Sequence, residues 1–195
     1  MDIARLTVFC GSSPGADPRH VTTATALGAA LAKRGIGLVY GGGHVGLMGA
    51  VADGALAAGG EVIGVMTEAL VAREIAHTGL SQLEVTATMH ERKARMADLG
   101  DGFTMLPGGF GTLDELFEAL TWTQLGVHDK PCSMLDPTGY FDPLLAFADR
   151  AVEQRFVRPE HRALLLVARE VDELLALLAA WQPTHGDKWL DRPKR

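Results

Sequence analysis

The sequence predicts an α/β fold in which helices cover both faces of a parallel β-sheet, and two observations carry that prediction. Short runs rich in β-branched and aromatic residues alternate with helical patterns of about 10–15 residues, the order that βαβ units produce. Glycine-rich turns directly follow several of the short runs, as they do at the ligand-binding edge of such sheets. The chain has 195 residues, and we expect one domain over residues 1–180 and an irregular tail over residues 181–195.

The first half of the chain alternates regularly between the two patterns. Residues 5–10 (RLTVFC) are typical of a strand, whereas residues 20–34 are rich in Ala and Leu at helical spacing and are followed by Gly35, which favours a helix end. By the same criteria we expect strands at residues 5–10, 36–40 and 61–66, and helices at residues 20–34 and 47–58. The segment 67–83 has no clear periodicity and receives no assignment.

The second half continues the alternation. We expect strands at residues 84–88, 103–106, 131–135 and 163–167, and helices at residues 89–99, 112–125, 140–155 and 171–180. The helix at residues 112–125 is apolar around much of its circumference, which is typical of a helix buried in a core or at a subunit interface. Burial between two copies of the chain would give a homodimer.

Charge and cysteine usage exclude several classes of protein. The formal net charge is −6 at pH 7 and no run of Lys or Arg forms a basic stripe, so we expect neither nucleic acid nor a membrane surface as a partner. No apolar run approaches the ~20 residues of a membrane span, and the N-terminus lacks a secretory signal pattern. Cys10 and Cys132 lie in or beside apolar runs, which suits reduced, buried thiols, and neither cysteines nor histidines have metal-ligand spacing. We therefore expect a cytoplasmic protein that binds no metal.

The turn at residues 107–112 (PGGFGT) has the features of a phosphate-binding loop. It joins a predicted strand to the start of a predicted helix, where unpaired backbone N–H groups and the helix dipole attract an anion. Its glycines let backbone N–H groups approach a ligand without a Cβ in the way. The hydroxyl of Thr112 can add one more hydrogen bond.

Glu115 follows one turn later and has two interpretations. A carboxylate there could bind ribose hydroxyls, orient water or stabilise the positive charge that develops at the anomeric carbon when a glycosidic bond breaks. Thr112 and Glu115 also fit the capping box Ser/Thr-x-x-Glu, in which the glutamate only hydrogen-bonds the backbone at the helix start. Because a capping box does not require the preceding glycines, the loop and the carboxylate together favour the functional interpretation.

At these residues the sequence resembles a known family. Residues 107–115 (PGGFGTLDE) match the signature Pro-Gly-Gly-x-Gly-Thr-x-x-Glu of the LONELY GUY proteins, which are cytokinin riboside 5′-monophosphate phosphoribohydrolases, and residues 89–93 (MHERK) match a second segment, Met-His-x-Arg-Lys. The likeness runs from about residue 6 to residue 156. It implies a Rossmann-like three-layer α/β sandwich, usually a homodimer. Such an enzyme hydrolyses an N6-substituted adenosine 5′-monophosphate to the free base and ribose 5-phosphate, with neither a metal nor a cofactor.

Carried onto this sequence, the resemblance implies that Arg92 and Glu115 are the catalytic pair. The nucleoside 5′-monophosphate would be bound by Glu74, Arg92, Lys93, Gly108, Gly109, Phe110, Gly111, Thr112, Leu113, Asp114 and Thr121. A guanidinium can bind phosphate or hold a carboxylate through two hydrogen bonds. As an ordinary surface residue, Arg92 would instead lie beside an i,i+4 ion pair between Glu91 and Arg95. His90 could protonate the leaving base or be a plain surface residue.

Four other functions fit parts of the sequence. A broader nucleosidase acting on AMP would differ only in its base pocket, and a nucleotide sensor would keep the phosphate loop without the chemistry. Gly41-x-Gly43-x-x-Gly46, with Glu68 further on, satisfies a dinucleotide-binding pattern, but it follows the second predicted strand instead of the first. A pyridoxal-phosphate enzyme would need Lys93 as its Schiff-base lysine.

Overall fold

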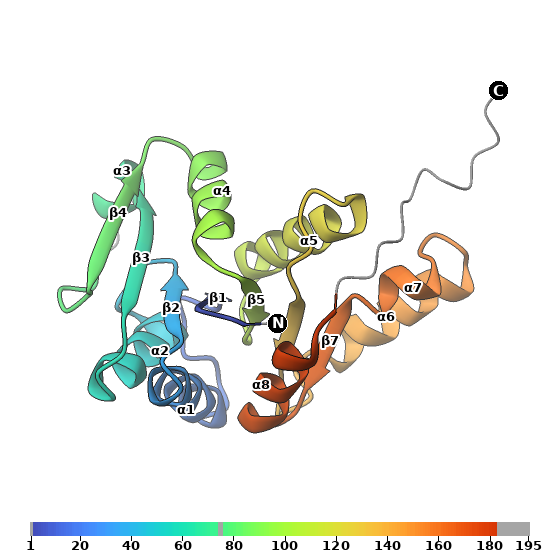
Figure 1. Ribbon diagram of the computed structural model, residues 1–195, viewed down its shortest axis with the longest axis horizontal. Helices are drawn as coiled ribbons and strands as arrows, with labels where there is room; N and C mark the ends of the chain where they lie inside the picture. Colours follow the sequence, from blue (N-terminus) through green and yellow to red (C-terminus); the bar gives the residue numbers. More distant parts are fainter. Residues whose placement is uncertain (1, 74–75, 183–195) are drawn as a thin grey trace.

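A parallel sheet organises the residues that the structure, a computed structural model, describes: 2–73 and 76–182 (Figure 1). From edge to edge its strands are β4 (Gln82–Thr86), β3 (Val62–Thr67), β2 (Gly37–Tyr40), β1 (Arg5–Phe9), β5 (Gly102–Met105), β6 (Cys132–Leu135) and β7 (Leu165–Ala168). Every neighbouring pair is parallel. The chain therefore builds outward from β1 to β4, crosses to the other side of β1 at β5, and builds outward again to β7.

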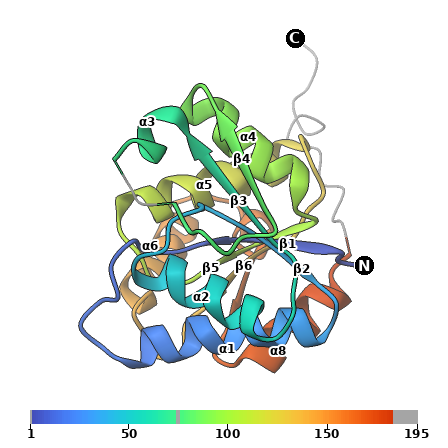
Figure 2. The same cartoon turned by 90° about the vertical axis from the view of Figure 1, so that its left-hand side faces the viewer.

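Helices cover both faces of the sheet, which confirms the predicted Rossmann-like α/β sandwich. In Figure 2, α1 (Arg19–Lys33), α2 (Gly46–Ala57) and α8 (Val171–Ala180) lie below the strands, and α4 (Met89–Leu99) and α5 (Phe110–Leu125) lie above them. The remaining helices of the described residues are α3 (Glu68–Val71), α6 (Asp142–Glu153) and α7 (Pro159–Arg162). None of these helices is long and apolar enough to cross a membrane.

Alternate side chains of β1 enter the two cores of the sandwich, as the two-residue period of a strand dictates. Leu6 and Val8 are buried on the side of α1 and α2. Phe9 lies on the opposite side and stacks on Phe103 of β5, with ring centroids 5.8 Å apart. The hydroxyl of Thr7 donates to the carbonyl oxygen of Met96 in α4 at 2.9 Å. Because β1 is covered on both faces, four of its five residues are buried, and they include the polar Thr7.

The structure describes parts of two segments whose conformation the sequence predicted poorly, residues 67–83 and the tail from residue 181. The unassigned segment 67–83 contains α3, and its residues 74–75 lie outside the described part of the chain. Trp181, the first residue of the expected tail, is buried, and its indole N–H donates to the carbonyl oxygen of Asp129 at 2.9 Å. Residues 183–195 of that tail lie outside the described residues.

Helices α1 and α2 pack with their backbones unusually close together. A Cβ added to Gly28 of α1 would lie 2.0 Å from the carbonyl oxygen of Val51, and one added to Gly54 of α2 would lie 2.2 Å from that of Thr25. Both obstacles are backbone atoms, which cannot rotate away as a flexible side chain can. The two glycines therefore set the spacing of the helices that support the loops after β1 and β2.

We expect Gly28→Ala to lower the free energy of unfolding by about 2 kcal/mol. Overpacking costs up to about 3 kcal/mol, and the better helix propensity of alanine returns about 1 kcal/mol. Urea denaturation measures the change. The control is Ala26→Ser on the exposed side of the same helix, which should stay within about 0.5 kcal/mol of the wild type. A fully stable Gly28→Ala variant would contradict the close packing.

Candidate active site

The loops that follow β1 and β5 flank a crevice at the carboxyl edge of the sheet. The two strands are neighbours, and the chain builds outward from them in opposite directions. This is the topological switch point, where open α/β sheets bind ligands. The crevice has a volume of about 480 Å³ and is lined mainly by residues 11–17 and 107–109, together with His20, Leu47 and Tyr140.

The glycine-rich turns after β1 (residues 11–15), β2 (residues 41–46) and β5 (residues 108–111) meet at this edge, as the sequence predicts. The N–H of Gly11 donates to the carbonyl oxygen of Pro107, and the N–H of Leu47 donates to the carbonyl oxygen of Gly11, both at 3.0 Å. Gly46 has a φ of +60°, and a Cβ there would lie 2.3 Å from the carbonyl carbon of Ser12. Both its conformation and its space thus require glycine. The last glycine of the dinucleotide-like pattern therefore has a packing role that needs no dinucleotide.

The last three residues of the phosphate loop, 110–112, form the first turn of α5. Gly109 is the N-cap and the helix begins at Phe110, so the N–H groups of Phe110, Gly111 and Thr112 have no acceptor one helical turn earlier. A Cβ on Gly109 or Gly111 would meet nothing within 4 Å, which leaves open space beside these groups. By contrast, a Cβ on Gly108 would lie 2.2 Å from the hydroxyl oxygen of Thr112. The loop is thus closely packed at Gly108 and open at the helix end.

The expected start of α5 at Thr112 is wrong by two residues, and the difference removes the capping-box interpretation of Glu115. Thr112 is the third residue of the helix, where it cannot be the N-cap, and no side chain caps α5. The same Thr-x-x-Glu spacing does form a cap at α4. There the Thr88 hydroxyl accepts from the N–H of Glu91 at 3.2 Å, and the Glu91 carboxylate accepts from the N–H of Ala87 at 3.0 Å.

Arg92 of α4 is buried and fully engaged. Its Nε donates to the carbonyl oxygen of Val65 in β3 at 2.8 Å, and its Nη1 donates to Oε1 of Glu115 at 3.0 Å. Its Nη2 lies 3.5 Å from the carbonyl oxygen of Gly41, just after β2. The side chain of Arg92 is 8% exposed and that of Glu115 13% exposed. The structure therefore brings the predicted pair into direct contact over the carboxyl ends of the strands.

The surface interpretation of Arg92 fails for a second reason. Glu91 is used in the cap of α4, so it does not pair with Arg95. Arg95 instead forms two hydrogen bonds with Glu84 of β4. The expected i,i+4 pair is thus replaced by a contact between a helix and an edge strand, which sequence spacing along one helix cannot indicate.

Burial raises the pKa of the Glu115 carboxyl above its ordinary value, although the charge and the hydrogen bond of Arg92 act in the opposite direction. A carboxylate that is buried beside one guanidinium is less well solvated than a surface carboxylate. It therefore binds a proton more readily and interacts more strongly with a positive charge that develops nearby. Both properties suit a group that assists the cleavage of a glycosidic bond.

Lys93 joins α4 to α5 through two ion pairs. Its Nζ lies 3.1 Å from Oδ2 of Asp114 and 3.0 Å from Oε2 of Glu118. Burial alone would lower the pKa of Lys93, but the hydrogen bonds with Glu118 and Asp114 outweigh it and the pKa is raised. The amine is therefore held as an ammonium, whereas a Schiff base forms from the neutral amine. This geometry argues against the pyridoxal-phosphate interpretation.

The other predicted substrate-binding residues occupy different positions. Phe110 is 92% exposed at the start of α5, and Leu113 is half-buried against the core beneath the helix. Thr121 lies on the exposed side of α5 and its hydroxyl donates to the carbonyl oxygen of Phe117 at 2.6 Å, so the fold does not bring it to the Arg92–Glu115 pair. Glu74 lies outside the described residues. His90 is exposed.

Sequence reasoning missed Tyr140, which lines the crevice. Its hydroxyl donates to the carbonyl oxygen of Gly108 in the phosphate loop at 2.8 Å. The signal that could have found it is its place just after β6, because the loops after neighbouring parallel strands meet at one edge of the sheet. The sequence pattern instead predicts a helix that begins at Tyr140, whereas α6 begins two residues later.

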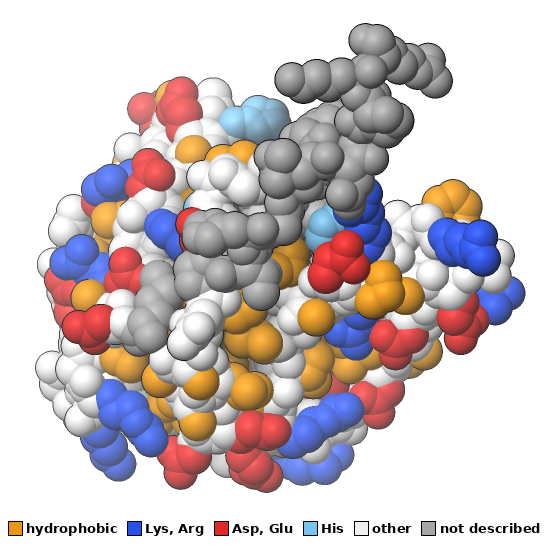
Figure 3. Space-filling view, turned by 45° about the vertical axis from the view of Figure 1, so that its right-hand side comes forward, with side chains coloured by type: hydrophobic (Ala, Val, Ile, Leu, Met, Phe, Trp, Pro, Cys, Tyr) orange, Lys and Arg blue, Asp and Glu red, His pale blue; other side chains and the backbone are white. Residues whose placement is uncertain are grey.

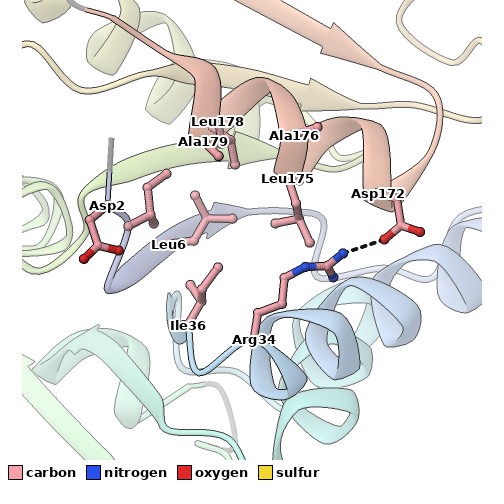
Figure 4. Close-up of a pocket in the computed structure, with 10 residues that line it drawn as sticks. Asp2, Leu6, Arg34, Ile36, Asp172, Leu175, Ala176, Leu178 and Ala179 are labelled. Carbon is pink, nitrogen blue, oxygen red and sulfur yellow. Dashed lines mark hydrogen bonds and ion pairs between the residues drawn. The ribbon is translucent and has the colours of Figure 1, made fainter.

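A second cavity, of about 370 Å³, lies at the opposite, amino edge of the sheet (Figure 4). Its walls come from the chain before and within β1, the start of β2, the end of α1 and helix α8. Arg34 and Asp172 form an ion pair at its rim, 2.8 Å apart. None of the predicted site residues lines this cavity, so we assign it no part in the chemistry.

Comparison with known sequences finds a matching family model and several similar proteins. A family model described as "Possible lysine decarboxylase" matches residues 48–178. A probable cytokinin riboside 5′-monophosphate phosphoribohydrolase of Oryza sativa subsp. japonica is 46% identical over 181 residues, which cover 93% of this chain and 72% of the rice protein. The cytokinin riboside 5′-monophosphate phosphoribohydrolase of Rhodococcoides fascians is 45% identical over 174 residues, 89% of this chain and 88% of that protein. One from Arabidopsis thaliana is 45% identical over 93% of this chain and 85% of its own.

Solved structures with the same fold are more distant in sequence. The molybdenum cofactor binding protein of Rippkaea orientalis is similar with a TM-score of 0.70 and 24% identity, over 92% of this chain and 98% of that chain. The molybdenum cofactor carrier protein of Chlamydomonas reinhardtii is similar with a TM-score of 0.68 and 21% identity, over 92% and 97%. At this level of identity the likeness establishes the fold alone.

We expect Glu115→Gln to keep the fold intact at neutral pH. Because burial raises the pKa of Glu115 in the folded state, the stability that its carboxyl contributes is present below the unfolded pKa and is lost as the pH rises through the folded pKa. A neutral amide avoids that loss and can still accept the hydrogen bond from Arg92. The melting temperature of the variant should therefore equal or exceed that of the wild type at pH 7. As the pH falls toward 4.5, the melting temperature of the wild type should rise relative to that of the variant.

The control for this measurement is the residue that does cap a helix. Thr88→Ala should lower the free energy of unfolding by about 1 kcal/mol, the usual contribution of an N-cap side chain. If Glu115→Gln lost as much stability at pH 7 as Thr88→Ala, a capping role for Glu115 would be the better account.

Proposed function

The chain belongs to the LONELY GUY family of cytokinin riboside 5′-monophosphate phosphoribohydrolases, and we propose that it hydrolyses the N-glycosidic bond of an N6-substituted adenosine 5′-monophosphate. The products are the free base and ribose 5-phosphate. The observation that carries the proposal is the buried contact between Arg92 and Glu115 beside the open N-terminus of α5. Relatives about 45% identical over most of the chain are named for this reaction.

The substrate phosphate binds at the N-terminus of α5. Backbone N–H groups of the loop donate to its oxygens, and the positive end of the helix dipole favours its charge. The absence of side chains at Gly109 and Gly111 gives the phosphate direct access to the backbone. Binding through fixed backbone groups suits a chain of net charge −6, because it needs no surplus of basic side chains.

Glu115 acts on the sugar. As the bond between C1′ and the base lengthens, positive charge grows on C1′ and the ring oxygen, and the Glu115 carboxylate stabilises it. Water then attacks C1′ and transfers a proton to Glu115, whose raised pKa makes it a better acceptor than a surface glutamate. The base leaves with the electron pair of the C1′–N bond and takes up one proton from solvent, and Glu115 later returns its proton to solvent. Arg92 fixes the carboxylate in place through Nη1, since its own position is set by Val65 and Gly41.

A homodimer forms part of the same proposal. Large apolar side chains are exposed on and after α5, at Phe117 (40%) and Val127 (67%), and on and after α6, at Phe147 (69%) and Phe156 (88%). Figure 3 turns this side of the molecule toward the viewer and shows hydrophobic side chains at the surface among interspersed acidic and basic ones. Burial against a second subunit would remove this apolar surface from water.

We place the protein in the cytoplasm. Cys10 and Cys132 are both free and buried, and burial raises the pKa of the Cys132 thiol to about 12, so it stays protonated and unreactive. Two unpaired thiols of this kind suit a reducing compartment.

The decisive experiment compares turnover of AMP and of isopentenyladenosine monophosphate, with free base and ribose 5-phosphate as the measured products. Glu115→Gln should reduce the release of base by about 10²–10⁴-fold, the usual contribution of a general acid–base group, and should still bind the nucleotide. Glu118→Gln, one turn further along α5, is the matched control and should retain activity.

Each other outcome of this experiment selects a different account. Preference for plain AMP would indicate the broader nucleosidase. Nucleotide binding without any release of base by the wild type, even at high enzyme concentration, would indicate a sensor. Undiminished turnover by Glu115→Gln would exclude Glu115 from the chemistry.

We expect light scattering at micromolar concentration to give about twice the chain mass of 20.8 kDa. Phe117→Glu should shift the protein toward the monomer, because it would place a charge in an apolar contact. The control is Ala26→Glu on the exposed side of α1. A wild-type species of 20.8 kDa would refute the dimer.

A further inference from the structure

The phosphate loop is restrained by a tyrosine that neither the family signature nor the proposed reaction assigns. The hydroxyl of Tyr140 donates to the carbonyl oxygen of Gly108 at 2.8 Å, across 32 residues of sequence. We propose that Tyr140 is a positioning residue that holds this loop in the conformation that binds phosphate. The inference rests on the proposed function only in taking the 5′-phosphate of a nucleotide as the ligand of the loop.

The geometry of the peptide bond explains why a carbonyl contact matters. In a trans peptide the carbonyl oxygen of one residue and the N–H of the next point in opposite directions from one rigid plane. Fixing the carbonyl of Gly108 therefore fixes the direction of the N–H of Gly109, the N-cap of α5. Adjacent glycines have wide conformational freedom, so without a restraint the loop would lose entropy each time it bound phosphate.

Tyr140 can act as a restraint because its own backbone is held firmly. Asp136, at the end of β6, is fully buried. Its carboxylate accepts hydrogen bonds from the N–H groups of Thr138 at 3.2 Å, Tyr140 at 3.0 Å and Phe141 at 2.8 Å, and from Nη1 of Arg169 at 3.2 Å. These contacts tie the segment after β6 into one turn, whose position is set by the sheet.

The charge state of Asp136 supports the same role. Burial alone would raise the pKa of this carboxyl, but hydrogen bonds from the N–H of Phe141 and from Thr138 outweigh it and the pKa is lowered. Asp136 is therefore ionised at neutral pH, and an ionised carboxylate makes the stronger hydrogen bonds. The turn that carries Tyr140 is thus fixed before any ligand binds.

The ring of Tyr140 is oriented by two edge-on contacts that do not involve its hydroxyl. Its centroid lies 4.8 Å from that of Phe141 and 5.9 Å from that of His20. Tyr140→Phe therefore removes the hydrogen bond to Gly108 and keeps the packing. The chain has two tyrosines, and the other, Tyr40, is buried with a hydroxyl that has no hydrogen-bond partner among the described residues. Tyr40→Phe is thus a matched control.

The test measures the affinity of the full chain for ribose 5-phosphate and inorganic phosphate by calorimetry. We expect Tyr140→Phe to weaken both about three- to tenfold, the range that the loss of one neutral hydrogen bond gives. KM for AMP should rise by a similar factor while kcat stays within about twofold, because a phosphate contact made equally in the ground and transition states affects KM alone. Binding of adenosine, which has no phosphate, should not change. Tyr40→Phe should match the wild type in every measurement.

Two results would overturn the inference: an unchanged affinity for ribose 5-phosphate in Tyr140→Phe, or an equal loss for ribose 5-phosphate and adenosine. If the variant melts several degrees lower, the deciding measurement is the NMR chemical shift of the Gly109 amide in its folded fraction. The inference requires this amide to shift more than the amides of β1. An unshifted Gly109 amide would also overturn it. Failure of the proposed function is distinguishable, because then the wild type binds phosphate, Tyr140→Phe weakens that binding, and neither releases base.

Discussion

A buried guanidinium has to satisfy its hydrogen bonds within the protein, and the position of Arg92 meets that constraint in a way that organises the site. Its partners are a backbone carbonyl within β3, one just after β2, and the Glu115 carboxylate on α5. A guanidinium left without hydrogen-bond acceptors at this depth would be strongly destabilising, so Arg92 holds α4, α5, β3 and the turn after β2 in one arrangement. The Glu115 carboxylate, to which we assign the catalytic role, is thereby placed by a requirement of folding, before any substrate is present.

The start of α5 is the second constraint, and it explains how one short segment can supply both functions that we propose for it. Because Gly109 caps the helix, the N–H groups after it stay available to a ligand, whereas a capping side chain would occupy one of them. The helix then carries Glu115 roughly 9 Å beyond the cap along its axis, at 1.5 Å per residue. A phosphate site and a carboxylate at a fixed distance follow from one continuous helix, which is a stiffer connection than two separate loops.

The sequence predicted the layers of the fold and the meeting of the glycine turns because both depend on local signals: strand and helix periods, and residues that permit tight turns. It predicted the contact of Arg92 with Glu115 only through the family resemblance, since nothing in the spacing of residues 92 and 115 indicates proximity. It left the role of Thr112 and Glu115 open because Thr-x-x-Glu has the same appearance at both helices. At α4 the threonine of this pattern, Thr88, is the N-cap. At α5 the N-cap is Gly109, so the helix begins before Thr112. Tyr140 was missed because its partner is 32 residues away and is a carbonyl group, which every residue possesses.

The relationship between this fold and its chemistry follows from where the charges lie. Structures with TM-scores of 0.68–0.70 to this chain are named for binding or carrying the molybdenum cofactor, so the shared sheet and its edge do not determine the ligand. What sets the chemistry is which polar groups are fixed at that edge. In this chain the guanidinium of Arg92, the carboxylate of Glu115 and the carbonyl of Gly108 held by Tyr140 are all positioned by protein contacts. Groups that are oriented in advance need not reorganise when charge develops, which is the condition under which electrostatic stabilisation of a transition state is most effective.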